Sequence, residues 1–343
     1  MRDCGFAIPG DHRQKTGGFI YERRLLEELQ AQGRAVRHLR LPPFRPDPPA
    51  AERRRICGIL AGLPPGMPLI LDGLSFAAMA PGDLAALGRP VIAMLHHPAG
   101  TEQGLPAPLA ARLLAQERAN LALAAHVVVT SPHSRDTYIG MGADPARLTV
   151  ALPGHDGPRG APREEAGPRI LSVGLLARRK GHDVLIRALA RIADLDWTAR
   201  IVGKTHDPAV KAELAALIAA HDLQARVTLA GELSDAALAR DYRRARIFAL
   251  ATRHEGYGMA LAEALCHGLP VVSCDAGAVP GTLAGAGLLA APEDAAGIAG
   301  HLRRLLEDVP LRSALSRRAE AEARALPRWR DTAAVMGGVL DRL

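Results

Sequence analysis

Several features are scarce in this chain of 343 residues, and each scarcity argues against a class of protein. Aromatic residues make up only 3%, too few for the stacking surfaces that hold single-stranded nucleic acid. The four cysteines form no Cys-x-x-Cys pair, and a chain of this length needs no disulfide framework, so we expect reduced thiols. No apolar run is long enough to cross a bilayer, and the N-terminus lacks the apolar core of a signal peptide. We therefore expect a cytoplasmic protein that at most rests on the inner face of a membrane.

Lysine is also rare, because the chain carries its excess of seven positive charges mainly as arginine. The arginines are interleaved with acids along the chain, which predicts mild attraction to anionic ligands or to an anionic membrane surface. The run Glu52–Arg55 is the clearest candidate for such peripheral membrane contact, although a solvated helix face is its default interpretation. One of the four lysines, Lys180, directly precedes a glycine and is a candidate for a functional role.

The hydrophobic content of 48% predicts a folded protein, and the length allows two domains with separate cores. Short apolar runs alternate with helix-length segments, which is typical of βαβ units around parallel sheets. Phe19–Gln32 has the apolar stripe of one such helix and ends before Gly33. The predicted strands are Cys4–Ile8, Pro68–Asp72, Val91–Leu95, His126–Ser131, Arg169–Gly174, Thr198–Gly203, Val227–Ala230, Arg246–Leu250 and Pro270–Cys274.

The segment Pro153–Pro162 is the richest in proline and glycine and lies between two series of βα units. We predict a linker at 154–163, an N-terminal domain of residues 1–153 plus about 318–343, and a C-terminal domain of residues 164–317. Pro327 suits the first turn of a last helix that returns to the N-terminal domain. Closure about the linker would exclude water from a site between the domains.

The most informative segment is His254–Leu265, which joins Glu255, a glycine turn, the start of a helix and Glu263. Free N–H groups and the dipole at a helix N-terminus suit a diphosphate, whereas carboxylates accept hydrogen bonds from sugar hydroxyls. Both acids follow a predicted parallel strand at its carboxyl end, where open α/β sheets bind ligands. The segment therefore predicts a ligand that is part phosphate and part sugar.

This segment closely resembles the E-x7-E region of family 4 glycosyltransferases, which have the GT-B fold of two Rossmann-like domains facing across a cleft. The resemblance covers nearly the whole chain and is strongest in its C-terminal half. It continues through Gly174–Asp183, Pro153–Asp156 and Thr16–Phe19.

In that family the first glutamate faces the donor sugar and the second binds the ribose, so the resemblance assigns these roles to Glu255 and Glu263. The backbone of the intervening turn would hold the sugar and the distal phosphate. Its residues are Gly256, Tyr257, Gly258, Met259 and Ala260.

Arg179 and Lys180 stand before Gly181 at the start of a predicted helix. A fixed guanidinium and ammonium would stabilise the charge that grows on a departing diphosphate, without a metal. The commonest family pattern has an arginine directly after Gly174, where this chain has Leu175. Arg179 is a candidate for the missing charge.

The remaining candidates lie at other strand ends. The resemblance suggests Gly17 and Gly18 over the donor phosphate and the acceptor, His97 on the donor sugar, and the turn of Glu232 and Leu233 beside the base. Asp72 and Glu102 are candidates for the acceptor side, Glu102 as a base or a hydroxyl ligand. Adjacent histidines point different ways on a strand, so His96 and His97 are not a metal site.

The resemblance implies a retaining, metal-independent glycosyltransferase without a cofactor, which moves a hexose-type sugar from a nucleotide sugar to a hydroxyl of a glycan, lipid-linked sugar or small molecule. Two alternatives stay open: a nucleotide-sugar epimerase, and a non-catalytic nucleotide-sugar-binding protein. A nucleic-acid partner is not expected, because no basic helix or aromatic face is evident. Neither the sugar, the base, the acceptor nor the oligomeric state can be read from the sequence.

Overall fold

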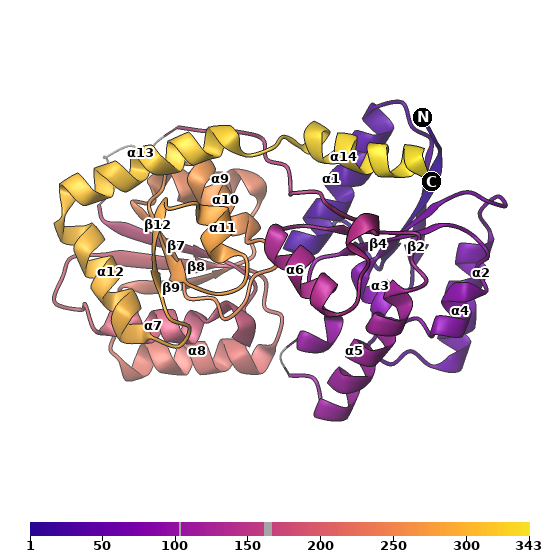
Figure 1. Ribbon diagram of the computed structural model, residues 1–343. Helices are drawn as coiled ribbons and strands as arrows, with labels where there is room; N and C mark the ends of the chain where they lie inside the picture. The colour runs from indigo at the N-terminus through magenta and orange to yellow at the C-terminus, as the bar shows by residue number, and fades with distance from the viewer. Residues whose placement is uncertain (103, 161–166) are drawn as a thin grey trace. The chain divides into compact units, whose positions relative to one another are not determined.

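The computed structural model describes residues 1–102, 104–160 and 167–343, and the chain divides into two compact units. Unit 1 consists of Met1–Gly154 and Pro327–Leu343, and unit 2 of His155–Leu326. Each unit contains a six-stranded parallel sheet flanked by helices (Figure 1). This arrangement confirms the predicted α/β class with two Rossmann-like domains.

The sheet of unit 1 has the strand order β2-β1-β3-β4-β5-β6. Its central strands are apolar and fully buried because helices cover them, as is usual for parallel sheets. The strands are β1 (Cys4–Pro9), β2 (Val36–Leu41), β3 (Leu69–Asp72), β4 (Val91–Leu95), β5 (His126–Val129) and β6 (Leu148–Val150).

The sheet of unit 2 has the order β12-β11-β10-β7-β8-β9, and apolar clusters built around Trp197 and Phe248 form its core. The strands are β7 (Arg169–Val173), β8 (Thr198–Val202), β9 (Val227–Gly231), β10 (Ile247–Leu250), β11 (Val271–Cys274) and β12 (Gly287–Ala290).

Each sheet has one point where the chain reverses the direction in which it adds strands. In unit 1 this switch point lies between β1 and β3, and in unit 2 it lies between β7 and β10. At a switch point the two following loops diverge to opposite faces of the sheet and leave a crevice at the carboxyl ends of the strands. The topology thus places the loops after β1 and β3, and after β7 and β10, as the candidate ligand positions.

Helix α14 (Trp329–Arg342) completes unit 1 by packing beside α1 (Gly17–Ala31), as Figure 1 shows. The ring of Trp329 lies 5.9 Å from that of Tyr21, and the buried Arg34 holds Asp341 through two hydrogen bonds of 2.9 and 3.0 Å. A bidentate guanidinium–carboxylate pair fixes geometry as well as charge. The last helix therefore belongs to the core of unit 1.

The remaining helices connect the strands. Those of unit 1 are α2 (Ala50–Ala61), α3 (Gly73–Ala78), α4 (Pro81–Ala85), α5 (Ala107–Leu121) and α6 (Pro132–Gly140). Those of unit 2 are α7 (His182–Ala190), α8 (Pro208–Ala220), α9 (Asp235–Arg244), α10 (Met259–Cys266), α11 (Val279–Leu283), α12 (Ala295–Glu307) and α13 (Val309–Ala325).

The predicted boundary of the C-terminal return differs from the structure. The sequence suggested about residue 318, but 318–326 lie in unit 2 because α13 runs on to Ala325 and packs against α10. The chain returns from unit 2 to unit 1 at Pro327. A proline disrupts the interior of a helix, so α13 ends before it. Residues 161–163 of the predicted linker, Pro162 among them, and 164–166 lie outside the described residues.

Candidate active site

The central contact of unit 2 joins Lys180 to Glu255. The Nζ atom of Lys180 lies 2.6 Å from Oε1 of Glu255, and the two side chains are 15% and 7% exposed. Lys180 follows β7 and Glu255 follows β10, so the pair spans the switch point of unit 2. The structure thus brings together two residues that are 75 positions apart in the chain.

A glycine makes this approach of the two loops feasible. Gly181 adopts a φ of +62°, and a Cβ atom there would lie 1.8 Å from the carbonyl oxygen of Ala251. The loops are joined further, because Arg253 donates its backbone N–H to the carbonyl oxygen of Arg179 at 2.9 Å. Only a residue without a side chain fits here, and it ends the short 3₁₀ turn (Arg178–Lys180) that presents Lys180.

Glu255 is held as a carboxylate. Burial would raise the pKa of Glu255, but the charges of Lys180 and Arg179 and the hydrogen bonds from Lys180 and Thr252 outweigh it and lower the pKa. The Thr252 hydroxyl lies 3.1 Å from Oε1 of Glu255, and Arg179 Nη1 lies 3.9 Å from Oε2. Arg179 also donates to the carbonyl oxygen of His254 at 3.1 Å, so both predicted cations gather at the same carboxylate.

The predicted glycine turn leads into α10 as expected. Gly258 has a φ of +95° and caps the helix, whose first backbone hydrogen bond runs from Leu261 N to Gly258 O at 2.9 Å. The N–H groups of Met259 and Ala260 precede that bond and have no partner within the helix. The loop that carries Glu255 is therefore followed by a helix N-terminus suited to an anion.

Glu263 lies one turn into α10, and burial raises the pKa of its carboxyl group. Its Oε2 atom accepts a hydrogen bond from the Tyr242 hydroxyl at 3.0 Å. The Tyr242 ring stacks on His267 with centroids 4.9 Å apart, which fixes the hydroxyl in place. Glu263 and Lys180 are related through the loop that carries Glu255, which contacts Lys180 and leads into α10.

Contacts with neighbouring loops fix the backbone of the loop between Glu255 and Glu263. A Cβ atom at Gly277, where φ is +61°, would lie 2.3 Å from the carbonyl oxygen of Glu255. The adjacent Ala278 donates its N–H to that oxygen at 2.9 Å. Tyr257 is buried, and its hydroxyl lies 3.3 Å from Nε2 of His155. These contacts hold the turn before any ligand arrives, which is the preorganisation that binding sites need.

The turn predicted to meet the base lies farther along the sheet. Glu232 is exposed after β9, and Leu233 is partly buried. Strand β9 is two strands away from β7, which corresponds to roughly 10 Å. That spacing is compatible with a nucleotide whose diphosphate lies near Lys180.

In unit 1 the switch point carries acids instead of a cation pair. Asp72 ends β3, is 3% exposed, and accepts the N–H of Ser75 at 2.9 Å as the cap of α3. Next to it lies Glu22 from α1, which is 1% exposed and which sequence reasoning missed. Gly17 and Gly18, predicted as a loop, are the first residues of α1, and the His96 ring lies beneath Gly18.

His97 and Glu102 form a pair of their own, with His97 Nε2 2.9 Å from Glu102 Oε2. The short turn between them is anchored by the buried Glu117, which accepts the Ala99 N–H at 3.1 Å. His96 instead turns toward Glu22, its Nε2 lying 3.8 Å from Oε1 of that residue. The two histidines thus point to different neighbours, as expected for adjacent residues after a strand.

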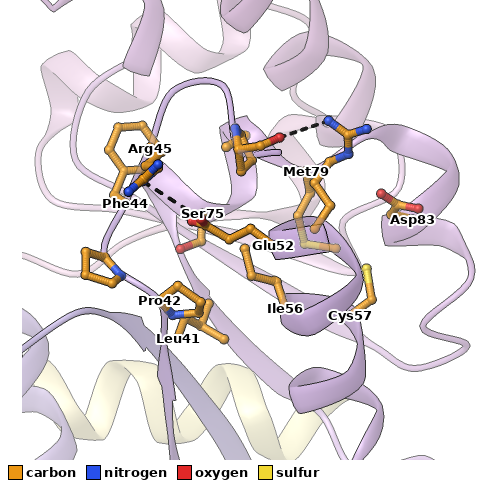
Figure 2. Close-up of a pocket in the computed structure, with 14 residues that line it drawn as sticks. Leu41, Pro42, Phe44, Arg45, Glu52, Ile56, Cys57, Ser75, Met79 and Asp83 are labelled. Atoms are coloured by element: carbon orange, nitrogen blue, oxygen red, sulfur yellow. Dashed lines mark hydrogen bonds and ion pairs between the residues drawn. The ribbon is translucent and has the colours of Figure 1, made fainter. Parts of the chain in front are cut away.

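A hollow of about 520 Å³ lies elsewhere on unit 1 and is lined by side chains of α2 and α5, among them Arg53, Arg54 and Arg112. Asp47 and Asp83 also line it, and Asp47 pairs with Arg112 at 2.9 Å. An adjoining apolar pocket of about 30 Å³ lies between α2, α3 and the loop after β2. Figure 2 shows Phe44, Ile56 and Met79 around it and the contact of Arg45 with Glu52 at 3.8 Å.

Within the described residues, no group of three or more His, Cys, Asp or Glu side chains is arranged to hold a metal ion. In the same part of the chain, no helix combines the length and apolar character needed to span a membrane.

Two family models match the chain. The model described as glycosyl transferases group 1 matches residues 158–322, and the one described as glycosyl transferase 4-like domain matches residues 9–154. Together they cover most of both units, and the pair is that of the GT-B glycosyltransferases. The chain therefore belongs to the family 4 type of GT-B glycosyltransferases.

Among curated relatives, the chain is 30% identical over 276 residues to a D-inositol 3-phosphate glycosyltransferase of Kineococcus radiotolerans, covering 71% of this chain and 62% of the relative. It is 28% identical over 166 residues to a mannosylfructose-phosphate synthase of Agrobacterium fabrum, covering 43% and 37%. The match thus spans less than two thirds of these relatives' lengths.

Among solved structures, a sucrose-phosphate synthase from Thermosynechococcus elongatus is similar, with a TM-score of 0.80, 22% identity, and coverage of 99% of this chain and 98% of that one. Anabaena HepE in complex with UDP and glucose is similar with a TM-score of 0.77 and 16% identity over all of both chains. At these identities the likeness establishes the fold.

Proposed function

We propose that the protein is a retaining, metal-independent glycosyltransferase that moves a hexose from a nucleotide sugar to a hydroxyl acceptor. The observation that carries the proposal is the meeting of Lys180, Arg179 and Glu255 at the switch point of unit 2, followed in the chain by the N-terminus of α10. Cations and N–H dipoles recognise a diphosphate, and a carboxylate recognises sugar hydroxyls. The site therefore has the two halves of a nucleotide-sugar ligand.

The reaction proposed here breaks the bond between the anomeric carbon and the phosphate oxygen and forms a bond from that carbon to the acceptor oxygen. Lys180 and Arg179 stabilise the charge that appears on the diphosphate, and this role of two cations is what supports independence from a metal. The acceptor attacks from the face that the phosphate leaves, and the departing phosphate oxygen takes the acceptor proton. Glu255 binds donor hydroxyls and Glu263 the ribose.

The donor class is supported by HepE, whose complexes contain UDP, glucose and UDP-glucose. We propose a UDP-hexose as the first donor to test. For the acceptor, the curated relatives include a D-inositol 3-phosphate glycosyltransferase and a mannosylfructose-phosphate synthase, whose names contain a phosphorylated polyol and a sugar phosphate. A phosphorylated polyol or sugar is therefore the acceptor we propose first.

The first experiment is a thermal-shift screen of UDP, GDP, ADP and dTDP sugars. A ligand at a hundred times its Kd stabilises the folded state by about 2.7 kcal/mol, so the correct donor raises the melting temperature. Lys180→Ala and Glu255→Gln should lose the shift or the turnover. A thermal shift and a turnover that both persist unchanged in the two variants would contradict the site.

The second experiment incubates the donor with D-inositol 3-phosphate and other sugar phosphates in EDTA, with product detection by mass spectrometry. Transfer with retained anomeric configuration by NMR supports the proposal. An isomerised nucleotide sugar formed without any acceptor would instead identify an epimerase. Donor binding with no transfer to any acceptor would favour the non-catalytic alternative. The presence of Leu175, where the family pattern usually has an arginine, is the observation that supports this alternative.

We also propose contact with a membrane surface, on the basis of the basic residues Arg53–Arg55 of α2. Co-sedimentation with vesicles containing anionic lipid tests it. Binding should fall when salt is raised, because the attraction is screened. Equal co-sedimentation of the protein with neutral and anionic vesicles would contradict the membrane contact and would leave the transferase assignment unaffected.

A further inference from the structure

The feature of unit 1 that its predicted role does not explain is the buried carboxyl pair Glu22–Asp72. The two side chains are almost fully buried and lie close enough for the charge of Glu22 to act on Asp72. Neither oxygen of Glu22 receives a hydrogen bond from a donor in the described part of the chain. Two neighbouring buried carboxyl groups do not both ionise readily, because like charges repel each other strongly away from water.

Burial raises the pKa of both carboxyl groups of this pair. Burial and the neighbouring charge of Glu22 raise the pKa of Asp72 well above its ordinary value, and the Ser75 N–H only partly offsets them. Burial raises the pKa of Glu22 to about 7. Above neutral pH, Glu22 therefore carries a negative charge.

The charged oxygen of Glu22 faces His96, whose Nε2 lies 3.8 Å from Oε1. Nε2 is buried and has no hydrogen-bond partner in the described residues, although 22% of the side chain is exposed. The exposed part of the ring is therefore not at Nε2. Tyr21 fixes the ring plane from the edge at 5.4 Å, and burial lowers the pKa of His96, which keeps the imidazole neutral.

We propose that Glu22 is a positioning residue for His96: its carboxylate selects the tautomer with hydrogen on Nε2 and leaves the Nδ1 lone pair to accept a hydrogen bond from a sugar hydroxyl. Asp72, a candidate for the acceptor side, is a buried neighbour of Glu22. This inference rests on the proposed function for the identity of the hydroxyl, but not for the tautomer.

The groups packed around the pair are consistent with this role. The Tyr21 hydroxyl is turned away from Glu22 and donates to the carbonyl oxygen of Ala151 at 3.0 Å. On the side of Asp72, Tyr138 donates to Glu117 at 2.9 Å and so satisfies that second buried acid separately. Among these neighbours, the His96 imidazole is the donor that remains for Glu22.

The test is the tautomeric state of His96, read from imidazole ¹⁵N chemical shifts in the full-length protein labelled with ¹⁵N-histidine. Assignment comes from the signal lost in His96→Gln. At pH 8 we expect hydrogen on Nε2 in the wild type. In Glu22→Gln we expect hydrogen to shift toward Nδ1, because an amide can donate to an unprotonated Nε2. Glu27→Gln, the same change on an exposed face of α1, should leave the signal unchanged.

A wild-type His96 with hydrogen on Nδ1, or an unaltered tautomer in a folded Glu22→Gln variant, would overturn the proposal. The measurement needs no substrate, so it is independent of whether transfer is found. With an active donor and acceptor, Glu22→Gln should lower kcat at least tenfold and leave the thermal shift by the donor diphosphate intact. Unchanged kcat and acceptor KM, in spite of a changed tautomer, would also overturn the positioning role.

Discussion

The switch points of the two units occupy the same place in equivalent sheets and carry opposite chemistry. In unit 2, Lys180 and Arg179 surround Glu255 and lower the pKa of its carboxyl group. In unit 1, Glu22 and Asp72 lie together, and burial raises the pKa of both. A shared topology thus determines where a ligand can bind, and the side chains determine its chemistry: under the proposed function, unit 2 binds the donor diphosphate and unit 1 meets sugar hydroxyls.

The difference extends to the response of each unit to pH. Unit 2 buries histidines whose pKa is lowered to about 4, His182 and His267, whereas unit 1 buries acids whose pKa is raised to about 7, Glu22 and Glu117. Each unit also contains one tryptophan, Trp329 in unit 1 and Trp197 in unit 2. Variants with a single tryptophan, Trp197→Phe or Trp329→Phe, therefore report the unfolding of one unit at a time.

The largest expected effect is on catalysis in unit 2. Lys180→Ala removes the ammonium that faces the leaving diphosphate, so kcat should fall by about 10²–10³ or more, as for the loss of other preorganised charge-stabilising groups. Initial rates measure the loss, and an unchanged thermal unfolding profile shows that the fold persists. The matched control is Arg178→Ala, two positions earlier, whose guanidinium pairs with the exposed Glu213 at 2.6 Å. Full activity of Lys180→Ala would contradict the proposed contrast between the switch points of the two units.

The next effect concerns the close approach that assembles the cation site. Gly181→Ala places a methyl group 1.8 Å from a backbone oxygen in a left-handed conformation that itself costs about 1–2 kcal/mol. We expect a total loss of about 3 kcal/mol in the free energy of unfolding of unit 2, measured by urea titration of Trp197 fluorescence. Gly285→Ala, with a φ of +85° and no atom within 4 Å of the added Cβ, should show the conformational cost alone. Equal losses in both variants would contradict the steric account.

A third prediction separates the units by pH. The pKa of Glu22 is about 7 in the folded state against an ordinary value of 4.5, so the folded state binds more protons between these values. The free energy of unfolding of unit 1 therefore falls as pH rises through this window. Glu22→Gln should remove about 2–3 kcal/mol of that fall between pH 5 and 8, measured with Trp329 as reporter. The same dependence of the free energy of unfolding on pH in the wild type and in Glu22→Gln would contradict this prediction.

The fourth and smallest effect has the opposite sign. His182 is buried with a pKa of about 4 against 6.5, and its Nε2 lies 3.2 Å from the carbonyl oxygen of Leu175, so it stays neutral in the folded state. Between these values the unfolded state binds more protons, and unit 2 loses stability as pH falls. His182→Gln should reduce the loss between pH 7 and 5 by about 2 kcal/mol, with Trp197 as reporter. An acid response of unit 2 that is the same in this variant would contradict the assignment.

The sequence predicted the central strands well because each is a short apolar run bounded by turns. It missed β2, β6 and β12, all at sheet edges: half of the residues of β2 are polar, β6 has three residues, and β12 begins at a glycine. Edge strands are covered less completely, so their composition carries a weaker signal. The nine predicted strands lie within one or two residues of those in the structure.

The candidate site was predictable to the extent that motifs encode it. Glu255 and Lys180 belong to two separate sequence motifs, and the order of the strands in the sheet brings them together. Their assigned roles stay predictions. Glu22 was missed because a single acid in a helix usually faces solvent. A signal was present, however: Glu22 lies three positions after Phe19 and three before Leu25, on the apolar stripe of α1.

The discontinuity of unit 1 has a consequence for synthesis on the ribosome. Residues 155–326 form a contiguous stretch and can complete unit 2 once they have emerged, whereas unit 1 must wait for α14 to supply Trp329 and the partner of Arg34. Until then the surface of α1 that α14 covers stays open to the surroundings. The nascent chain therefore completes unit 2 first, and unit 1 is the part that exposes apolar surface for longer.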